Sequence, residues 1–339
     1  MSKHWDPLQD MPALDGKVAV VTGGNSGIGE AIVRLLALRG AKVYFTTRSE
    51  AKAQKTQQQI RVTNPEIKQE DINSLVLDFT DLQSITDVAS ELGRREKKVD
   101  ILIHNAAVTP PDIDPVGPGW EPHMTMGFIG PFVFINRLLP LLQNALLYDG
   151  ADVRIISLSS TAQISMLPAD FKFELDSPSG LSTPVTYYPW HWRYLARFLF
   201  SFNMIRFAIS KAATVILAEE LQRRLDEQNT PILSMAVHPG ETATEAVLRN
   251  IPSLLGPVAR LAFLKPDQGA ATPLFAVTAK EVRRDSERYK GKFILPGGNI
   301  GVPNPVAKDE RQVKGLWKHA TDAVDKELAA RNLPPLGMW

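Results

Sequence analysis

The sequence predicts a doubly wound parallel α/β sheet, because short apolar runs alternate with helical patterns over the first 160 residues. The runs are rich in β-branched residues and apolar throughout, as expected of strands that helices cover on both faces. A glycine-rich turn joins the first run to the first helical pattern. Since crossovers between parallel strands are right-handed, these observations lead to a doubly wound sheet.

The elements follow one another in a regular order. The first five predicted strands are KVAVVT (17–22), KVYFTT (42–47), INSLVL (72–77), VDILIH (99–104) and DVRIISLSS (152–160). The first two strands are followed by helical patterns at 27–41 and 49–62. The second half adds a helix at 202–228, strands at 231–240 and 292–298, and a charged helix around 307–331.

No repeat or low-complexity linker divides the 339 residues, so we expect one domain over 1–339. The pattern breaks at 161–200, which holds the cluster YYPWHWRYLARFLF. We interpret this segment as an aromatic-rich insertion, partly loop and partly helix, that forms part of a substrate lid. Residues 300–339 are expected to form a C-terminal extension.

Composition excludes several classes of function. The 38 basic and 37 acidic residues balance and form no basic block, so nucleic acid is not an expected partner. The absence of cysteine excludes disulfides and thiolate metal sites and suits a reducing compartment. The first 16 residues lack an apolar signal core. We therefore expect a cytoplasmic protein, and no metal site is predicted.

One apolar stretch, residues 127–148, resembles a membrane span in length. It carries Arg137, Asn136, Gln143, Asn144 and two prolines. Because central charge is costly in lipid, we expect a buried interior or interface helix and no membrane span.

The turn VVTGGNSGIG predicts a nucleotide site. Gly23 lets the chain turn tightly, while Gly27 and Gly29 leave room for a pyrophosphate and for packing of the helix on the strand. The start of the helix then offers free N–H groups and partial positive charge to phosphate.

The end of the second predicted strand indicates which cofactor is bound. NAD sites place a carboxylate there to hold the ribose 2′-hydroxyl, whereas NADP sites tend to place an arginine. Here the strand ends with Thr47 and Arg48 and no acid. Arg48 can bind a 2′-phosphate through two hydrogen bonds, so NADP(H) is favoured over NAD(H).

These motifs, taken in order, resemble the short-chain dehydrogenase/reductase family over residues 15–300. The spacing T-G-x-x-x-G-x-G (22–29) is that family's glycine loop; HNAA (104–107) resembles its N-N-A-G motif, and HPGETAT (238–244) its P-G-x-x-x-T loop. The insertion and the GLWKH segment (315–319) look most like fungal secondary-metabolism members. The cofactor-binding residues that the resemblance implies are Gly23, Asn25, Ser26, Gly27, Ile28, Gly29, Arg48, Asp78, Asn105, Ala106, Lys211, Pro239, Gly240, Thr242 and Thr244.

The resemblance also implies a Rossmann-type domain with an Asn-Ser-Tyr-Lys tetrad. Serine and tyrosine bind the substrate oxygen, and tyrosine transfers the proton. Lysine binds the nicotinamide ribose and lowers the tyrosine pKa, and asparagine helps to hold a proton-relay water. Ser160 and Lys211 match this tetrad, but Phe207 stands at the tyrosine position and Gly127 at the asparagine position. Loss of a positioned acid typically costs roughly 10²–10⁴ in rate.

Four interpretations of Phe207 remain open. The reaction is one that does not need this acid, such as reduction of an iminium; or the site carries out non-redox isomerisation, cyclisation or dehydration; or Phe207 is an engineered Tyr→Phe change, which would not account for Gly127. In the fourth, the proton comes from another residue in the insertion, for which the candidates are Tyr187, Tyr188, His191, Tyr194, Asp170 and Glu174.

The insertion also indicates the substrate. Ser160 and Phe207 are 47 positions apart, which adds some thirty residues beside the pocket relative to the resembled family. Its aromatic side chains favour a bulky, lipophilic small molecule. The arginines Arg193, Arg197 and Arg206 either bind a carboxylate or face water, and we expect them to face water.

Three functions follow as hypotheses. The first is an NADP(H)-dependent oxidoreductase with an atypical proton donor. The others are a cofactor-binding isomerase or cyclase, and a pseudoenzyme that binds NADP(H). The resemblance implies a homodimer or homotetramer through the helices at 127–148 and 200–227.

Overall fold

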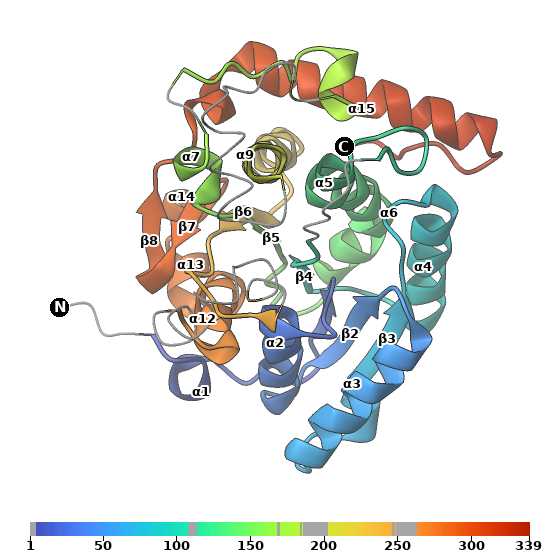
Figure 1. Cartoon of the computed structure of the whole chain (residues 1–339). Coiled ribbons are helices and arrows are strands. Elements are labelled where there is room, and N and C mark those ends of the chain that lie inside the picture. The colour runs from blue at the N-terminus through green and yellow to red at the C-terminus, as the bar shows by residue number, and fades with distance from the viewer. Residues whose placement is uncertain are drawn as a thin grey trace.

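The computed structural model describes residues 5–107, 114–167, 170–183, 185, 203–245, 248 and 263–339. One eight-stranded sheet runs through the molecule in the order β3-β2-β1-β4-β5-β6-β7-β8 (Figure 1). Strands β1 to β7 pair in parallel, and β8 pairs antiparallel with β7. The prediction of a doubly wound, mostly parallel sheet is confirmed.

The strands lie where the apolar runs predict them. Their bounds are β1 Val18–Val21, β2 Lys42–Thr47, β3 Ile72–Val76, β4 Ile101–His104, β5 Arg154–Leu158, β6 Leu233–Val237, β7 Phe293–Leu295 and β8 Asn299–Gly301. The sequence pattern does not predict β8, because it has three residues and no apolar run of its own. It folds back on β7 through Gly297 and Gly298, whose φ angles are +79° and +74°.

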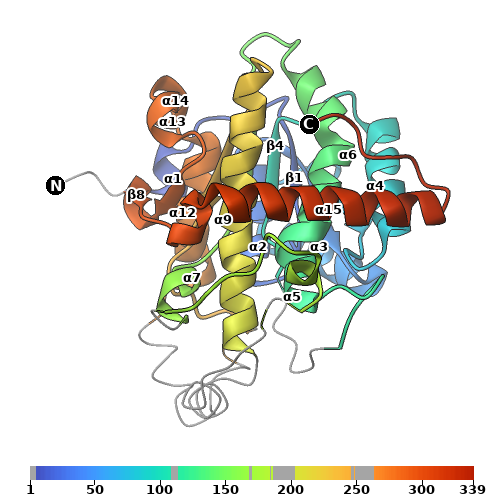
Figure 2. The ribbon, with the colours of Figure 1, turned by 90° about the horizontal axis from the view of Figure 1, so that it is seen from above.

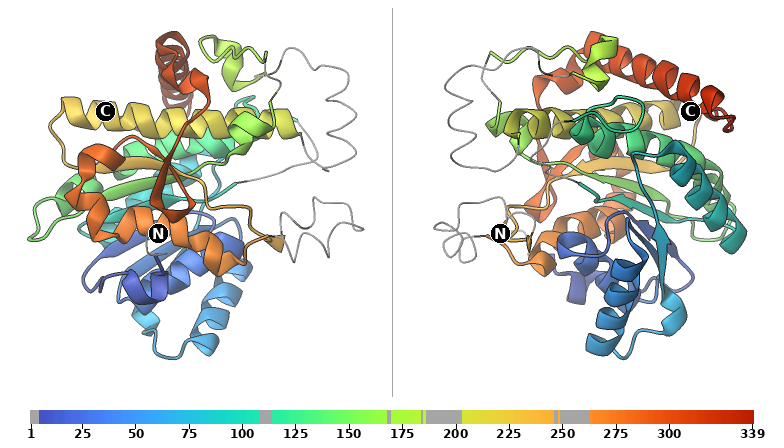
Figure 3. Two further views of the ribbon diagram at one scale, coloured as in Figure 1. Left: turned by 90° about the vertical axis from the view of Figure 1, so that its left-hand side faces the viewer. Right: turned by 45° about the vertical axis from the view of Figure 1, so that its right-hand side comes forward.

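Helices cover both faces of the sheet (Figure 3). The helices on one face are α2 Gly27–Leu38, α3 Glu50–Thr63 and α12 Pro266–Thr278, with the short α1 Pro7–Asp10, α13 Lys280–Arg284 and α14 Ser286–Tyr289 beside them. On the other face lie α4 Leu82–Arg95, α6 Gly130–Ala145 and α9 Met204–Glu227. Helix α12 escapes the sequence analysis because it contains Gly269 and Pro273 and is buried on nearly every side, which leaves no amphipathic stripe.

The apolar stretch at 127–148 forms the interior. A short helix, α5 Pro122–Met124, leads into one π-helical turn, η2 Thr125–Ile129, and then into α6. Within this run the most apolar window, long enough to span a membrane by composition alone, is 78% buried inside the protein. Its side chains join the core between the sheet and the outer helices, as the interior-helix prediction states.

Helix α15 Glu310–Ala330 adds a layer outside α6 and α9, which it crosses (Figure 2). The rings of Trp317 and Trp339 lie 5.0 and 4.5 Å from that of Phe132 on α6. Asn136, also on α6, donates to the carbonyl of Gly337 at 3.0 Å and accepts from its N–H at 2.8 Å. The outer faces of α6 and α9 are therefore covered by the chain's own C-terminal segment.

The described part of the insertion packs beneath α15. Gln312 accepts from the N–H of Leu175 at 2.7 Å and donates to Asp176 at 2.7 Å. The short helices here are α7 Ala162–Ser165 and the 3₁₀ turn η3 Pro178–Leu181. The aromatic cluster at 187–200 lies outside the described residues, as do Arg193 and Arg197, so the lid stays a prediction.

Candidate active site

The carboxyl ends of β1 and β4 are joined by one threonine. The Thr22 hydroxyl accepts from the N–H groups of Asn105 at 3.1 Å and Ala106 at 3.0 Å. The Asn105 amide donates in turn to the carbonyls of Thr22 at 2.9 Å and Gly23 at 3.1 Å. Asn105 and Ala106, which the sequence places in the cofactor site, thus fix the shape of the glycine turn.

The glycine turn forms a cradle that side chains would fill. Gly23 has φ +65°, and a Cβ added there would lie 2.9 Å from the Cα of Ala106. A Cβ on Gly29 would collide with the Asn105 amide and the Gly23 carbonyl. Ser26 precedes α2 and makes no side-chain capping bond, which leaves the first N–H groups of that helix for another acceptor. Asn25 and Ile28 are half-buried beside the turn. This donor set fits the pyrophosphate of a dinucleotide.

The ends of β2 and β3 supply two more predicted contacts. Arg48, one residue beyond β2, is exposed and makes no hydrogen bond or ion pair with the described residues. Asp78, beyond β3, is held in place because it accepts from the N–H and hydroxyl of Thr80 at 2.9 and 2.8 Å. Arg48 and Asp78 follow the ends of two neighbouring strands, since Thr47 of β2 pairs with Val76 of β3.

The loop after β6 returns to the glycine turn. Gly240, next to Pro239, has φ +87°, and its missing Cβ makes room for Leu264. The buried Thr242 donates to the Gly240 carbonyl at 3.1 Å. Thr244 then reaches Gly27, whose added Cβ would lie 3.0 Å from the Thr244 methyl group. The first and last motifs of the predicted cofactor site therefore meet.

Lys211 is held at the end of β5. Its Nζ donates to the carbonyl of Leu158 at 2.8 Å, and its own carbonyl accepts from the Ser159 hydroxyl at 2.7 Å. Burial lowers the pKa of Lys211 to about 8. Nζ lies 5.5 Å from the centre of the Phe207 ring. Ser160 is half-buried beside them, and its hydroxyl accepts from the N–H of Ala162 at 3.2 Å. The structure thus brings Lys211 close to Phe207 and to the strand end that carries Ser160.

Gly127 packs tightly where the resembled family has asparagine. A Cβ there would lie 3.1 Å from the Ser210 Cβ, and the Gly127 carbonyl already accepts from the Thr214 hydroxyl at 2.8 Å. An asparagine side chain would need α9 to move away from the π-helical turn. The close packing of Gly127 against α9 therefore leaves little room for an asparagine side chain at this position.

A buried charge cluster joins α5 to the first turn of α9. The Glu121 carboxylate accepts from the N–H of Met124 at 2.7 Å, contacts the His123 ring at 2.8 Å and lies 3.6 Å from the Arg206 guanidinium. The expectation that Arg206 faces water is wrong, because this guanidinium is buried against a buried carboxylate. No periodicity in the sequence signals the pairing, since Glu121 is 85 positions away from Arg206.

His238 is a second polar residue that the sequence analysis did not single out. It is 7% exposed, and its Nε2 lies 3.7 Å from the Glu241 carboxylate. Burial lowers the pKa of His238, the nearby Lys211 cation lowers it further, and Glu241 raises it. The buried Nδ1 has no hydrogen-bond partner among the described residues. Its position in HPG, within a motif already assigned to the cofactor, was the signal available in the sequence.

Two of the six alternative proton donors lie among the described residues. Asp170 and Glu174 are exposed. The four aromatic and histidine candidates, Tyr187, Tyr188, His191 and Tyr194, lie outside the described residues.

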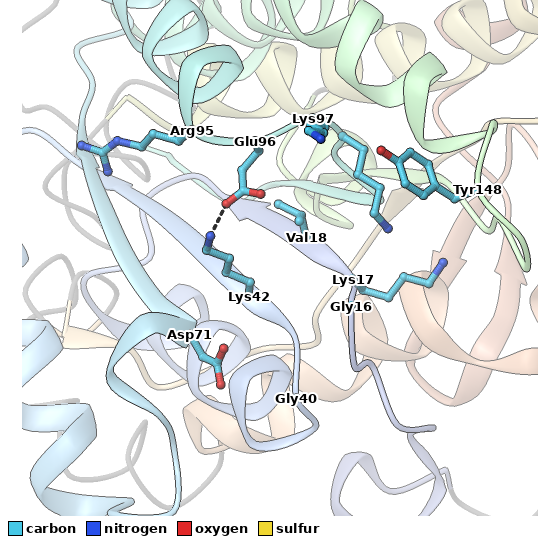
Figure 4. A pocket seen from close by; sticks show the side chains of 11 residues that line it. Gly16, Lys17, Val18, Gly40, Lys42, Asp71, Arg95, Glu96, Lys97 and Tyr148 are labelled. Carbon is cyan, nitrogen blue, oxygen red and sulfur yellow. Dashed lines mark ion pairs between the residues drawn. The ribbon is translucent and has the colours of Figure 1, made fainter.

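A separate cavity of about 470 Å³ lies at the opposite, amino-terminal edge of the strands (Figure 4). Three of its lysines form ion pairs, because Lys17 and Lys98 pair with Asp100 and Lys42 pairs with Glu96. The described part of the chain holds no group of three or more His, Asp or Glu side chains that could bind a metal ion.

Comparisons with known proteins match this arrangement. Residues 17–169 fit the family model described as short chain dehydrogenase. The short chain dehydrogenase/reductase dpchH of Colletotrichum higginsianum is 38% identical over 94% of this chain and 77% of that protein. The relative dpfgH of Gibberella zeae is 36% identical over 95% of this chain and 86% of that protein. Among solved structures, NADPH-bound carbonyl reductase from chicken fatty liver superposes with a TM-score of 0.60 at 21% identity, covering 89% of this chain and all of that one.

Proposed function

The chain belongs to the short-chain dehydrogenase/reductase family of oxidoreductases, and we propose that it is an NADP(H)-dependent member with an atypical proton donor. Its substrate is a bulky, lipophilic carbonyl, alcohol or imine of the secondary-metabolite kind. Arg48 carries the cofactor assignment, because its guanidinium, which has no partner in the described part of the chain, follows β2 where an NAD site would place a carboxylate. The NADPH-bound carbonyl reductase of similar fold supports the same assignment.

The residues of this site have separable roles. The glycine cradle and the start of α2 would hold the pyrophosphate, and Arg48 the 2′-phosphate. The nicotinamide, when bound, supplies or accepts the hydride. Ser160 would offer a hydroxyl to the substrate oxygen, and Lys211 holds its ammonium at the carbonyl of Leu158, two residues before Ser160. The predicted lid, formed in part by the aromatic-rich insertion at 161–200, is the reason for proposing a lipophilic substrate.

A non-redox isomerase or cyclase is the second candidate, and Phe207 with Gly127 is the observation that favours it. Phe207 stands where the resembled family has the tyrosine that transfers the proton, and Gly127 where it has the asparagine that holds the relay water. The glycine turn that would hold the cofactor keeps the family's spacing. A pseudoenzyme that only binds NADP(H) would leave the same pattern. We propose a cytoplasmic location, which suits a chain without cysteine.

Two measurements test the proposal. Calorimetric titration should give tighter binding of NADPH than of NADH, and Arg48→Ala should weaken NADPH binding roughly 10- to 100-fold without changing NADH binding. Arg284→Ala, another exposed arginine without a described partner, is the matched control. Equal affinity for both cofactors in the unaltered chain would rule out the NADP(H) assignment.

Deuterium-labelled NADPH separates the activities. Transfer of deuterium to a lipophilic ketone, aldehyde or imine identifies the reductase. Product formed without consumption of NADPH identifies the isomerase or cyclase. Binding without turnover over the whole panel supports the pseudoenzyme.

A further inference from the structure

A reductase of this kind needs a proton as well as a hydride, and the inference that follows rests on the proposed function. Phe207 has no proton to give, and Gly127 has no side chain to hold a relay water. Lys211 is the ionisable group of the resembled tetrad that remains. The question is which residues connect Lys211 to solvent.

Lys211 and His238 converge on one rung of the sheet. Leu158 of β5 pairs with Val237 of β6, and the Leu158 carbonyl accepts the Lys211 Nζ. His238 is the next residue after Val237, and its N–H donates to the carbonyl of Ile294 at 2.8 Å. Burial is the main cause of the lowered pKa of His238, and the Lys211 charge lowers it further.

Glu241 completes a path outward. Its carboxylate lies 3.7 Å from the His238 Nε2 and 3.5 Å from the Thr161 hydroxyl, while its side chain is 68% exposed. His238 itself is buried, and its Nδ1 lacks a described partner. Lys211 on α9 and Glu241 on the same loop are the two charged groups that act on this imidazole among the described residues.

We propose that the Lys211 ammonium is the proton source of this site, and that His238 and Glu241 form the relay that refills it from solvent. His238 is thus a positioning residue that acts through Lys211. In this arrangement, side chains from α9 and from the loop after β6 take over the roles of the phenol that Phe207 lacks and the amide that Gly127 lacks.

The proton balance is as follows for a carbonyl substrate reduced by a dihydronicotinamide. A dihydronicotinamide held in the cradle would supply the hydride for the new C–H bond and be oxidised to nicotinamide, while the C=O π pair moves onto oxygen. That oxygen takes a proton from Lys211 Nζ, whose N–H bond breaks and leaves a neutral amine. A hydronium ion from solvent beside Glu241 protonates the free nitrogen of the neutral His238 ring and becomes water. The resulting imidazolium gives the proton on its other nitrogen to Nζ, which restores the ammonium and the neutral ring.

Kinetics of five variants test the relay through NADPH oxidation. His238→Ala should lower turnover about 100-fold, with added imidazole restoring part of it, and Glu241→Gln should lower it about threefold. His319→Gln, a histidine on α15, is the control. In Phe207→Tyr the added phenol supplies the proton, so His238→Ala should matter little in that background. The proposal is overturned if His238→Ala turns over as fast as the unaltered chain. It is also overturned if His238→Ala causes the same loss of turnover in the unaltered chain and in Phe207→Tyr, and imidazole restores neither.

Nuclear magnetic resonance titration of the His238 ring tests the same relay without turnover. Lys211→Met should raise the pKa of His238, because a repelling cation is removed, and Glu241→Gln should lower it. A titration that moves in neither variant overturns the relay. If no substrate accepts hydride from NADPH with either the unaltered chain or Phe207→Tyr, the proposed function fails, while this titration still decides whether the path exists.

Discussion

The Nζ of Lys211 lies 5.5 Å from the centre of the Phe207 ring and donates to the Leu158 carbonyl at 2.8 Å. A cation is therefore buried beside an apolar ring, at a position where the resembled family has a phenol. This relationship sets both the chemistry and the pH behaviour of the site.

The buried lysine makes stability depend on pH. The pKa of Lys211 falls from 10.5 to about 8 in the folded chain, so the unfolded chain binds more protons between these values and stability rises with pH there. Below pH 8 the cost is about 3 kcal/mol, from 1.36 kcal/mol per pKa unit. Lys211→Met should raise the melting temperature at pH 7 and lose this advantage by pH 10.5. An advantage of equal size at both pH values would contradict the assignment.

Restoring the phenol should restore ordinary catalysis. Phe207→Tyr adds one hydroxyl beside Lys211, and we expect NADPH oxidation to rise roughly 100-fold on a substrate that the unaltered chain reduces slowly. Phe207→Leu, which adds no acid, serves as the control. An unchanged or lower rate with tyrosine would mean that the proton already comes from elsewhere or is not needed.

Gly27 should tolerate no side chain. It has φ +56° and touches Thr244, so Gly27→Ala adds strain of about 1–2 kcal/mol and pushes the loop away from the cradle. We expect weaker NADPH binding by calorimetry. Gly93→Ala is the control, because Gly93 lies in α4 with nothing within 4 Å of the added carbon. Equal binding by both variants would show that Thr244 and Gly27 do not shape the site.

The Glu121 cluster should hold the start of α9 in place. Glu121→Gln leaves the Arg206 guanidinium buried without its counter-charge, which typically costs about 3–5 kcal/mol. Chemical denaturation should register this loss. Glu310→Gln breaks an exposed pair with Lys314 and should change nothing measurable. If the two variants are equally stable, groups other than Glu121 stabilise the buried charge of Arg206.

The covered helices should prevent the expected dimer. Trp317 and Trp339 pack on Phe132, so the outer faces of α6 and α9 are not free for a second copy. Light scattering after size-exclusion chromatography should give a monomer mass. Trp317→Ala should lower stability by about 3–5 kcal/mol and expose this face, with Leu147→Ala, an exposed residue, as the control. A dimer that survives unchanged in Trp317→Ala would have to use another surface.

The sequence predicts the strands well because each parallel strand is a short apolar run, as in Val18–Val21. It places Gly27 and Thr244 in one predicted cofactor site, and the structure brings these two residues together, while cofactor binding by them stays a prediction. It does not predict α12, which is buried on almost all sides and so shows no helical period.

Pairings distant in sequence are the other gap. The ion pair of Glu121 with Arg206 depends on how α9 packs against α5, and the effect of the Lys211 charge on His238 depends on how α9 packs against β6. No local sequence pattern encodes that packing. The covering of α6 by Trp339 depends likewise on a chain reversal after α15.

The meeting of Gly27 with Thr244 has a consequence for biosynthesis. These residues are 217 positions apart, and translation at roughly 5–20 residues per second separates their synthesis by roughly 10–40 seconds. During that interval the glycine turn and α2 have emerged, but the loop that faces them has not. Nucleotide capture is therefore expected to be a late event in the life of the nascent polypeptide, and the amino-terminal half must stay free of aggregation without help from bound cofactor.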